Sequence, residues 1–180
     1  MKRPGVPTVV SLLLLAAVLA GVLMPGSPLV FFGLKRAIAF KFPGVRQVSP
    51  GELVAWMADP GDRRPPLLID ARSEAEYRVS HIEGAVRIDP VQPDLQPVAA
   101  VGHRTPVVVY SATGVRATAL AEALRKERFD EVADLEGGIF EWANEGRPLV
   151  NDRGPVSVVH PRDDWWGRLL KPQYRAPVGS

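Results

Sequence analysis

Short apolar runs alternate with amphipathic stretches through the middle of the chain. Residues 107–110 are apolar and mostly β-branched, which is typical of a strand buried on both faces of a parallel sheet. A small-residue loop follows, and apolar residues then recur at helical spacing. The sequence therefore predicts a strand that leads through a tight loop into a helix. The residues expected on the buried face of this helix are Val115, Ala119, Leu120, Ala123 and Leu124.

The same alternation continues on both sides of this unit. Short apolar runs bounded by turn residues predict further strands over residues 67–70, 85–88 and 131–135. Strands that alternate with helices form a parallel sheet covered by helices, with ligands at the carboxyl ends of the strands. We therefore expect an α/β fold, a three-layer α/β/α domain with a central parallel sheet.

Helix signals fall between these strands. Residues 49–52 and 73–76 have the spacing of a capping box and predict two helix starts. A last helix is expected between the glycine pair at 137–138 and Gly146, and the proline-rich residues 91–105 indicate a surface loop or a broken helix. The first of these helices is expected to bury Leu53, Val54 and Met57.

An uncharged apolar stretch runs from about residue 6 to residue 24. As a helix it approaches the thickness of the hydrocarbon core of a bilayer, and residues 29–34 could extend it beyond the break at 25–28. We expect a single-pass N-terminal membrane anchor; a signal peptide that is cleaved on export is the alternative. The charges flanking the stretch do not decide on which side of the membrane the domain lies.

The residues after this stretch mix aromatic and basic side chains. Such a mixture is typical of a segment at the lipid headgroup level. The residues concerned are Phe31, Phe32, Lys35, Arg36, Phe40, Lys41 and Phe42.

Charge is distributed unevenly over the 180 residues. The net charge is +2, but six basic residues precede the first acidic one, Glu52, and the remainder holds 16 basic and 20 acidic residues. The part expected to be globular is therefore mildly acidic. This distribution gives no support for nucleic-acid binding.

Four ordered blocks of the sequence carry a family resemblance. They are Leu67-Leu68-Ile69-Asp70-Ala71-Arg72, Glu76-Tyr77 with Ser80-His81-Ile82-Glu83-Gly84-Ala85, Tyr110-Ser111-x-x-Gly114-x-Arg116, and Leu135-Glu136-Gly137-Gly138-Ile139 with Trp142 and Gly146. Together these blocks closely resemble the rhodanese-like (sulfurtransferase) domain family. The resemblance covers residues 47–150, the size of one domain, and leaves residues 1–46 as an N-terminal segment and residues 151–180 as a tail.

The resemblance implies that position 111 is the catalytic position, at which the family has a cysteine that carries a persulfide. Ser111 occupies this position, and the chain has no cysteine at all. Sulfur transfer needs a thiolate that stores the sulfur atom, and a serine hydroxyl is too weakly acidic and too hard a nucleophile to replace it. We therefore expect no sulfurtransferase activity. The alternative is a sulfurtransferase that uses a thiol supplied by another molecule.

A serine-dependent hydrolase is a further alternative. It would need a histidine base for Ser111, and the chain offers His81, His103 and His160. His81 falls in a turn that a histidine usually orders in the related family. Asp70 could orient a histidine, but pairing with the nearby Arg72 is the plainer interpretation. We expect Asp70, Arg72 and His81 to support the loop rather than to react.

The loop after the central strand has the form of an anion cradle. A strand that enters a helix through a tight loop directs backbone N–H groups and the positive end of the helix dipole at one small volume, and Arg116 can add a guanidinium. The sequence has no metal-ligand cluster and predicts no cofactor. The residues expected to bind a small anion or a protein partner are Ser111, Ala112, Thr113, Gly114, Val115 and Arg116.

The C-terminal tail carries an adjacent tryptophan pair, Trp165 and Trp166, beside leucines and cations. Such a segment can pack on its own domain or lie at a membrane interface. Together these features predict a membrane-tethered, noncatalytic rhodanese-like module, with a sulfurtransferase or serine hydrolase as the alternative class.

Overall fold

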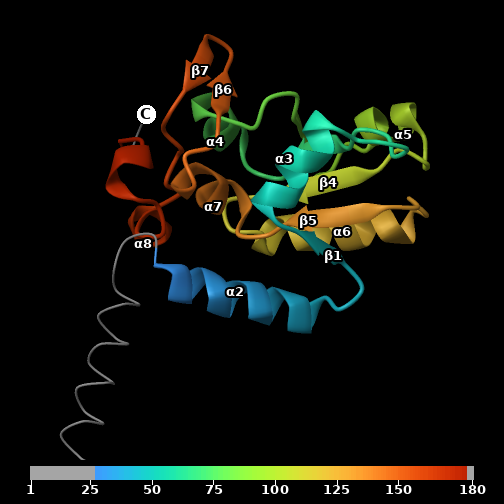
Figure 1. Cartoon of the computed structure of the whole chain (residues 1–180), viewed down its shortest axis with the longest axis horizontal. Helices are drawn as coiled ribbons and strands as arrows, with labels where there is room; N and C mark the ends of the chain where they lie inside the picture. The colour runs from blue at the N-terminus through green and yellow to red at the C-terminus, as the bar shows by residue number, and fades with distance from the viewer. Residues whose placement is uncertain (1–26, 178–180) are drawn as a thin grey trace, which may run out of the picture.

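The computed structural model describes residues 27–177, and a five-stranded parallel sheet lies at its centre (Figure 1). The strand order is β1-β5-β4-β2-β3, with β4 in the middle, and every neighbouring pair is parallel. The predicted α/β fold with a central parallel sheet is thus confirmed. The strands are β1 (Arg46–Val48), β2 (Leu67–Asp70), β3 (Val86–Arg87), β4 (Val107–Tyr110) and β5 (Val132–Leu135).

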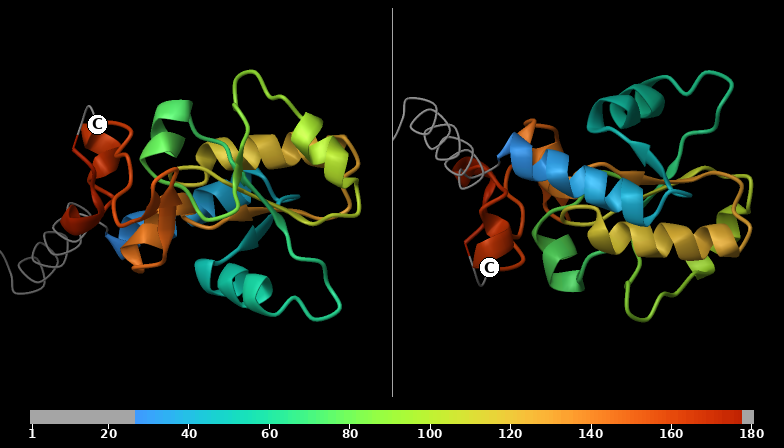
Figure 2. Two further views of the ribbon diagram at one scale, coloured as in Figure 1. Left: turned by 90° about the horizontal axis from the view of Figure 1, so that it is seen from above. Right: turned by 90° about the horizontal axis from the view of Figure 1, so that it is seen from below.

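Helices cover both faces of this sheet. Figure 2 shows α3 on one side and α5 and α6 on the other. A two-stranded antiparallel hairpin, β6 (Leu149–Asn151) and β7 (Gly154–Val156), follows the last helix of the sheet domain. The helices are α2 (Pro28–Lys41), α3 (Pro50–Ala58), α4 (Glu74–Val79), α5 (Gln96–Val101), α6 (Val115–Lys126), α7 (Gly138–Asn144) and α8 (Asp164–Gly167), with a 3-10 turn η1 (Pro172–Tyr174).

Alternate residues of β4 enter two separate apolar clusters. Val108 and Tyr110 pack with α3 and α7, whereas Val107 and Val109 pack with α5 and α6. All four side chains are completely buried, because side chains of a strand alternate between the two faces of a sheet. Apolar packing on both faces of the sheet therefore fixes β4, and with it the start of the loop that follows.

The helix starts at Ser49 and Ser73 are capped as predicted. Each serine hydroxyl accepts a hydrogen bond from the backbone N–H three residues later, and the glutamate there accepts one from the serine N–H. The strand expected at 85–88 is shorter, Val86–Arg87, and α5 forms inside the segment expected to be a loop or a broken helix.

The buried faces of two helices differ from the prediction. In α3, Leu53 and Trp56 are buried, and Val54 and Met57 are exposed, because the helix turns its largest side chain toward the sheet. In α6, Val115, Ala119 and Ala123 are exposed. Apart from Thr118, the buried residues follow the i, i+3, i+4, i+7 pattern from residue 117; they are Ala117, Thr118, Leu120, Ala121 and Leu124.

The predicted membrane stretch at residues 6–24 lies outside the described residues. Within 27–177, no helix is both long enough and apolar enough to cross a bilayer. Residues 29–34 belong to α2, which lies beside α6 (Figure 2). Phe31 and Ile38 of α2 are buried, whereas Phe32 and Phe40 are exposed, so this segment packs on the domain with one face only.

The tail also packs on the domain. Leu169 and Leu170 are buried in the same cluster as Phe31, and the side-chain amide of Asn144 in α7 donates to the Leu169 carbonyl at 2.7 Å. Trp166 packs partly against this cluster, but Trp165 remains exposed. Among residues 151–177, Trp165 is thus the large apolar side chain that stays exposed.

Candidate functional site

Ser111 lies at the carboxyl end of β4, in the loop that leads into α6. Its side chain is almost fully buried, at 1% exposure, and its Oγ accepts a hydrogen bond from the Gly114 N–H at 3.1 Å. The Ser111 hydroxyl therefore already accepts the hydrogen bond that the Gly114 amide could otherwise donate to a bound anion. Ala112, Thr113 and Gly114 are buried with it.

The start of α7 is bonded to this loop. The amides of Ile139 and Phe140 donate to the carbonyls of Ser111 and Ala112 at 2.9 and 3.0 Å. A side chain at Gly138 would stand 2.2 Å from the Ser111 carbonyl oxygen, and its φ is +58°. Only glycine allows this close approach, which explains the glycine pair that the sequence places here.

Helix α2 covers the other side of the loop. Gly114 has a φ of +96°, and a Cβ placed there would meet Ile38 Cδ1 at 3.2 Å and Asp134 Oδ2 at 3.1 Å. Lys35, one turn before Ile38, forms ion pairs with Glu136 at 3.3 Å and Glu141 at 2.7 Å. The loop is thus enclosed by α2, β5 and α7.

Arg116 is held by a carboxylate from another helix. Its Nη1 and Nη2 donate to the Glu76 carboxylate of α4 at 2.9 and 2.7 Å. Burial opposes ionisation of Glu76, but the Arg116 guanidinium and the bonds from Ser73 outweigh it and lower the pKa of Glu76 to about 2. Ionised Glu76 therefore stabilises the fold above its ordinary pKa, and this contribution is lost as the pH falls toward 2.

Asp70 and Arg72 form a completely buried ion pair. Arg72 Nη2 lies 2.6 Å from Asp70 Oδ2 and also donates to the Ser80 carbonyl at 2.6 Å. The guanidinium thereby connects the end of β2 to the turn after α4. Asp70 pairs with arginine, as the plainer interpretation of the sequence held, and orients no histidine.

His81 orders the turn in which it lies. Its ring stacks on Tyr77 at 3.9 Å, its Nδ1 lies 3.1 Å from the Tyr77 carbonyl, and its amide donates to Val150. His103 stacks on Phe129. Among the hydrogen bonds of residues 27–177, none joins a histidine to Ser111 Oγ, so this part of the chain contains no hydrolase triad.

Asp134 is a member of the site that the sequence analysis did not identify. It is fully buried in β5, and its Oδ2 lies 3.1 Å from the Thr118 hydroxyl, which lies 2.9 Å from the Gly114 carbonyl. Burial raises the pKa of Asp134 well above its ordinary value. A neutral Asp134 can donate to Thr118, whose single proton then goes to Gly114. An acidic residue inside an apolar strand was the signal in the sequence.

Asp134→Asn is expected to stabilise the protein at neutral pH. Unfolding lets Asp134 ionise, so its contribution to stability falls as the pH rises above about 4, the pKa of an unfolded aspartate. Asparagine keeps a donor for Thr118 and has no charge to bury. We expect the free energy of unfolding at pH 7 to rise by roughly 1 kcal/mol or more, with the gain disappearing in acid. Urea unfolding of both proteins across this pH range measures it; a loss at pH 7 would contradict a neutral Asp134.

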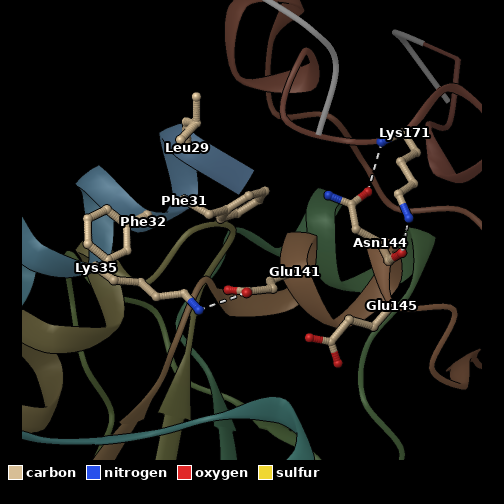
Figure 3. A pocket seen from close by; sticks show the side chains of 8 residues that line it. All are labelled: Leu29, Phe31, Phe32, Lys35, Glu141, Asn144, Glu145 and Lys171. Atoms are coloured by element: carbon tan, nitrogen blue, oxygen red, sulfur yellow. Dashed lines mark hydrogen bonds and ion pairs between the residues drawn. The ribbon is translucent and has the colours of Figure 1, made fainter. Parts of the chain in front are cut away.

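No group of three metal-binding side chains occurs among residues 27–177. A cavity of about 520 Å³ lies between α2, α7 and Lys171 (Figure 3), and no residue of the Ser111 loop lines it. Among the predicted site residues, Gly114 donates to Ser111, and Arg116 pairs with Glu76. Asp70 at the end of β2 pairs with Arg72, and His81 lies in the turn after α4.

Known proteins are similar to this chain in sequence. The segment aligned with the probable adenylyltransferase/sulfurtransferase MoeZ of Mycobacterium tuberculosis is 33% identical over 102 residues, 56% of this chain and 25% of that protein. The uncharacterized protein YibN of Escherichia coli is 29% identical over 111 residues, 61% of this chain and 75% of that protein. The chain thus spans only a quarter of the first relative.

A solved structure agrees with the fold. The thiosulfate sulfurtransferase of Pseudomonas aeruginosa superposes with a TM-score of 0.55 at 20% identity, over 77% of this chain and 25% of that one. The sequence profile of the rhodanese-like domain matches residues 49–145, more than half of the chain. The parallel sheet, the loop after β4 and this match agree, and the chain belongs to the rhodanese-like domain family.

Proposed function

We propose that this protein is a membrane-tethered rhodanese-like module that does not transfer sulfur. The observation that carries the proposal is the hydroxyl of Ser111 at the catalytic position of a chain without cysteine. Its Oγ accepts a hydrogen bond from Gly114, and no histidine is bonded to it within the described residues. An alcohol without a general base is not a nucleophile at neutral pH, which also disfavours the serine hydrolase alternative.

Mass spectrometry of the intact chain tests this proposal. After incubation with thiosulfate, the mass of the full-length protein is expected to remain unchanged. The variant Ser111→Cys is the matched control and is expected to gain one sulfur atom. A sulfur adduct on the unaltered chain, located by peptide mapping, would overturn the proposal.

We further propose that the Ser111 loop serves recognition of a small anion or of a protein partner. The first N–H groups of α6 have no acceptor within their own helix, and they carry the positive end of its dipole. Arg116 stands beside them, but Glu76 already neutralises its charge. An anion at this site must therefore compete with the glutamate.

Glu76→Gln is expected to strengthen anion binding. Glutamine preserves the capping box with Ser73, while Arg116 loses its carboxylate partner and becomes available to an added anion. We expect sodium sulfate, compared with sodium chloride at equal ionic strength, to raise the Tm of this variant more than that of the unaltered chain. Arg116→Ala in the Glu76→Gln background should remove the difference. Equal rises in all three proteins would show that Arg116 takes no part.

The membrane tether rests on the uncharged stretch at residues 6–24. We propose that this stretch holds the domain at a bilayer, and retention in the membrane pellet after alkaline carbonate washing is the expected result. Release into the supernatant would contradict a spanning anchor. A reporter fused after Ser180 then identifies the side on which the domain lies.

A further inference from the structure

We propose that the outer face of α2, together with Trp165 of α8, is a lipid-contacting surface that holds the domain flat against the bilayer. This inference rests on the proposed membrane tether. The tether alone keeps the domain near the bilayer, whereas this surface also fixes which face of the domain contacts the lipid.

The outer face of α2 is a continuous apolar and basic stripe. Leu29, Phe32, Arg36 and Phe40 follow one another at helical spacing, and the three apolar side chains are 52%, 61% and 90% exposed. The opposite face carries the buried Phe31 and Ile38. Large aromatic side chains are therefore exposed on a helix that is already fixed to its domain.

Charge on α2 favours an anionic surface. The helix contains three cations and no acidic residue, and the Arg36 guanidinium lies 5.6 Å from the centre of the Phe32 ring. The Lys35 ammonium is already bonded to the Glu141 carboxylate, as the dashed line in Figure 3 shows. Arg36 of the outer face is exposed and remains for lipid phosphates, and Lys41 adds a second exposed cation at the end of the helix, beside the Phe42 ring. Helices with basic and aromatic residues on one face bind at the headgroup level.

The tail carries a further exposed tryptophan, in the short helix α8. Figures 1 and 2 show α8 beside the beginning of α2, and Trp165 is 63% exposed while its neighbour Trp166 packs on the core. Arg162 and Arg168 flank the pair, and Asp163 caps α8 through the amides of Trp165 and Trp166. Asp164 is the other acidic residue of this helix. Tryptophan is the residue type that membrane interfaces favour.

The position of the apolar stretch selects lipid as the occupant. Residue 24, where the stretch ends, is only three positions before the first described residue, Ser27. The beginning of α2, which follows, lies beside α8 (Figure 1). A domain tethered by so short a connection keeps this end near the bilayer. A soluble partner would have to enter the space between the domain and the membrane.

Fluorescence quenching by brominated lipids tests the proposal. The full-length protein is reconstituted in vesicles of equimolar phosphatidylcholine and phosphatidylglycerol, with bromine on the upper acyl chain. We expect Trp165→Phe to lower the quenched fraction of the emission about two-fold. The matched control is Trp56→Phe, which removes a buried ring of α3 and should not lower the quenched fraction. Phe32→Ser with Phe40→Ser, two exposed substitutions, should reduce quenching of Trp165.

Flotation of the same vesicles separates the two proposals. If the protein floats and resists carbonate but Trp165 is not quenched, the lipid-contacting surface is wrong and the tether stands. If the protein does not float, both are wrong. Shielding of Trp165 from acrylamide that rises with protein concentration, without quenching by the brominated lipid, would identify a second copy as the occupant and overturn the proposal.

Discussion

Ser111→Cys is expected to convert this protein into a sulfurtransferase. The new sulfur would take the place of Ser111 Oγ, where the Gly114 amide donates at 3.1 Å and the N-terminus of α6 begins. Both favour a thiolate and should lower the pKa of the introduced thiol below the usual value of about 8.5. We expect thiocyanate formation from thiosulfate and cyanide to rise at least on the order of 100-fold above the unaltered chain.

Two comparisons make this result interpretable. Ser111→Ala should behave like the unaltered chain, because neither has a thiol. The pH dependence of iodoacetamide alkylation should report the lowered pKa of the introduced thiol independently of turnover. A thiol that alkylates only above its ordinary pKa, in a variant without activity, would show that the loop does not favour an anion.

Arg72→Met is expected to cause the largest loss of stability. Asp70 and Arg72 are both completely buried. Removal of the guanidinium leaves the Asp70 carboxylate without a counterion, although the backbone amide of residue 72 still donates to it, and takes a donor from the Ser80 carbonyl. Breaking a buried ion pair from one side costs roughly 3–5 kcal/mol. Urea unfolding followed by circular dichroism measures the free energy of unfolding.

The double variant Asp70→Leu with Arg72→Met distinguishes the cost of an unpaired Asp70 charge from the loss of the guanidinium contact with Ser80. It leaves no unpaired buried charge, so we expect it to be more stable than Arg72→Met alone. If the two variants are equally unstable, the guanidinium acts mainly through Ser80 and not through Asp70.

The central unit of the fold could be predicted because its signals are local. The β-branched run of β4, the small-residue loop and the two capping boxes each depend on a few adjacent residues. The position of Ser111 also followed, since its place after β4 fixes it in the loop. The order of these signals carried the family resemblance.

The contacts that close the site could not be predicted in the same way. Glu76 and Arg116 are 40 residues apart, and nothing local to either indicates its partner. The contact of Ile38 with Gly114 depends on where α2 packs on the domain. The hydrophobic periodicity of the α2 sequence does not specify that position. The prediction of the buried face of α6 was wrong because its alanines are equally frequent on both sides, with Ala117 and Ala121 buried and Ala119 and Ala123 exposed. Tertiary packing decided each of these features.

The central claim is that an oxygen atom at position 111 prevents sulfur transfer. Steady-state thiocyanate production by the unaltered full-length chain, with thiosulfate and cyanide and without added thiol, tests it most directly. The account predicts a rate equal to that of Ser111→Ala. A rate comparable to that of Ser111→Cys would contradict it.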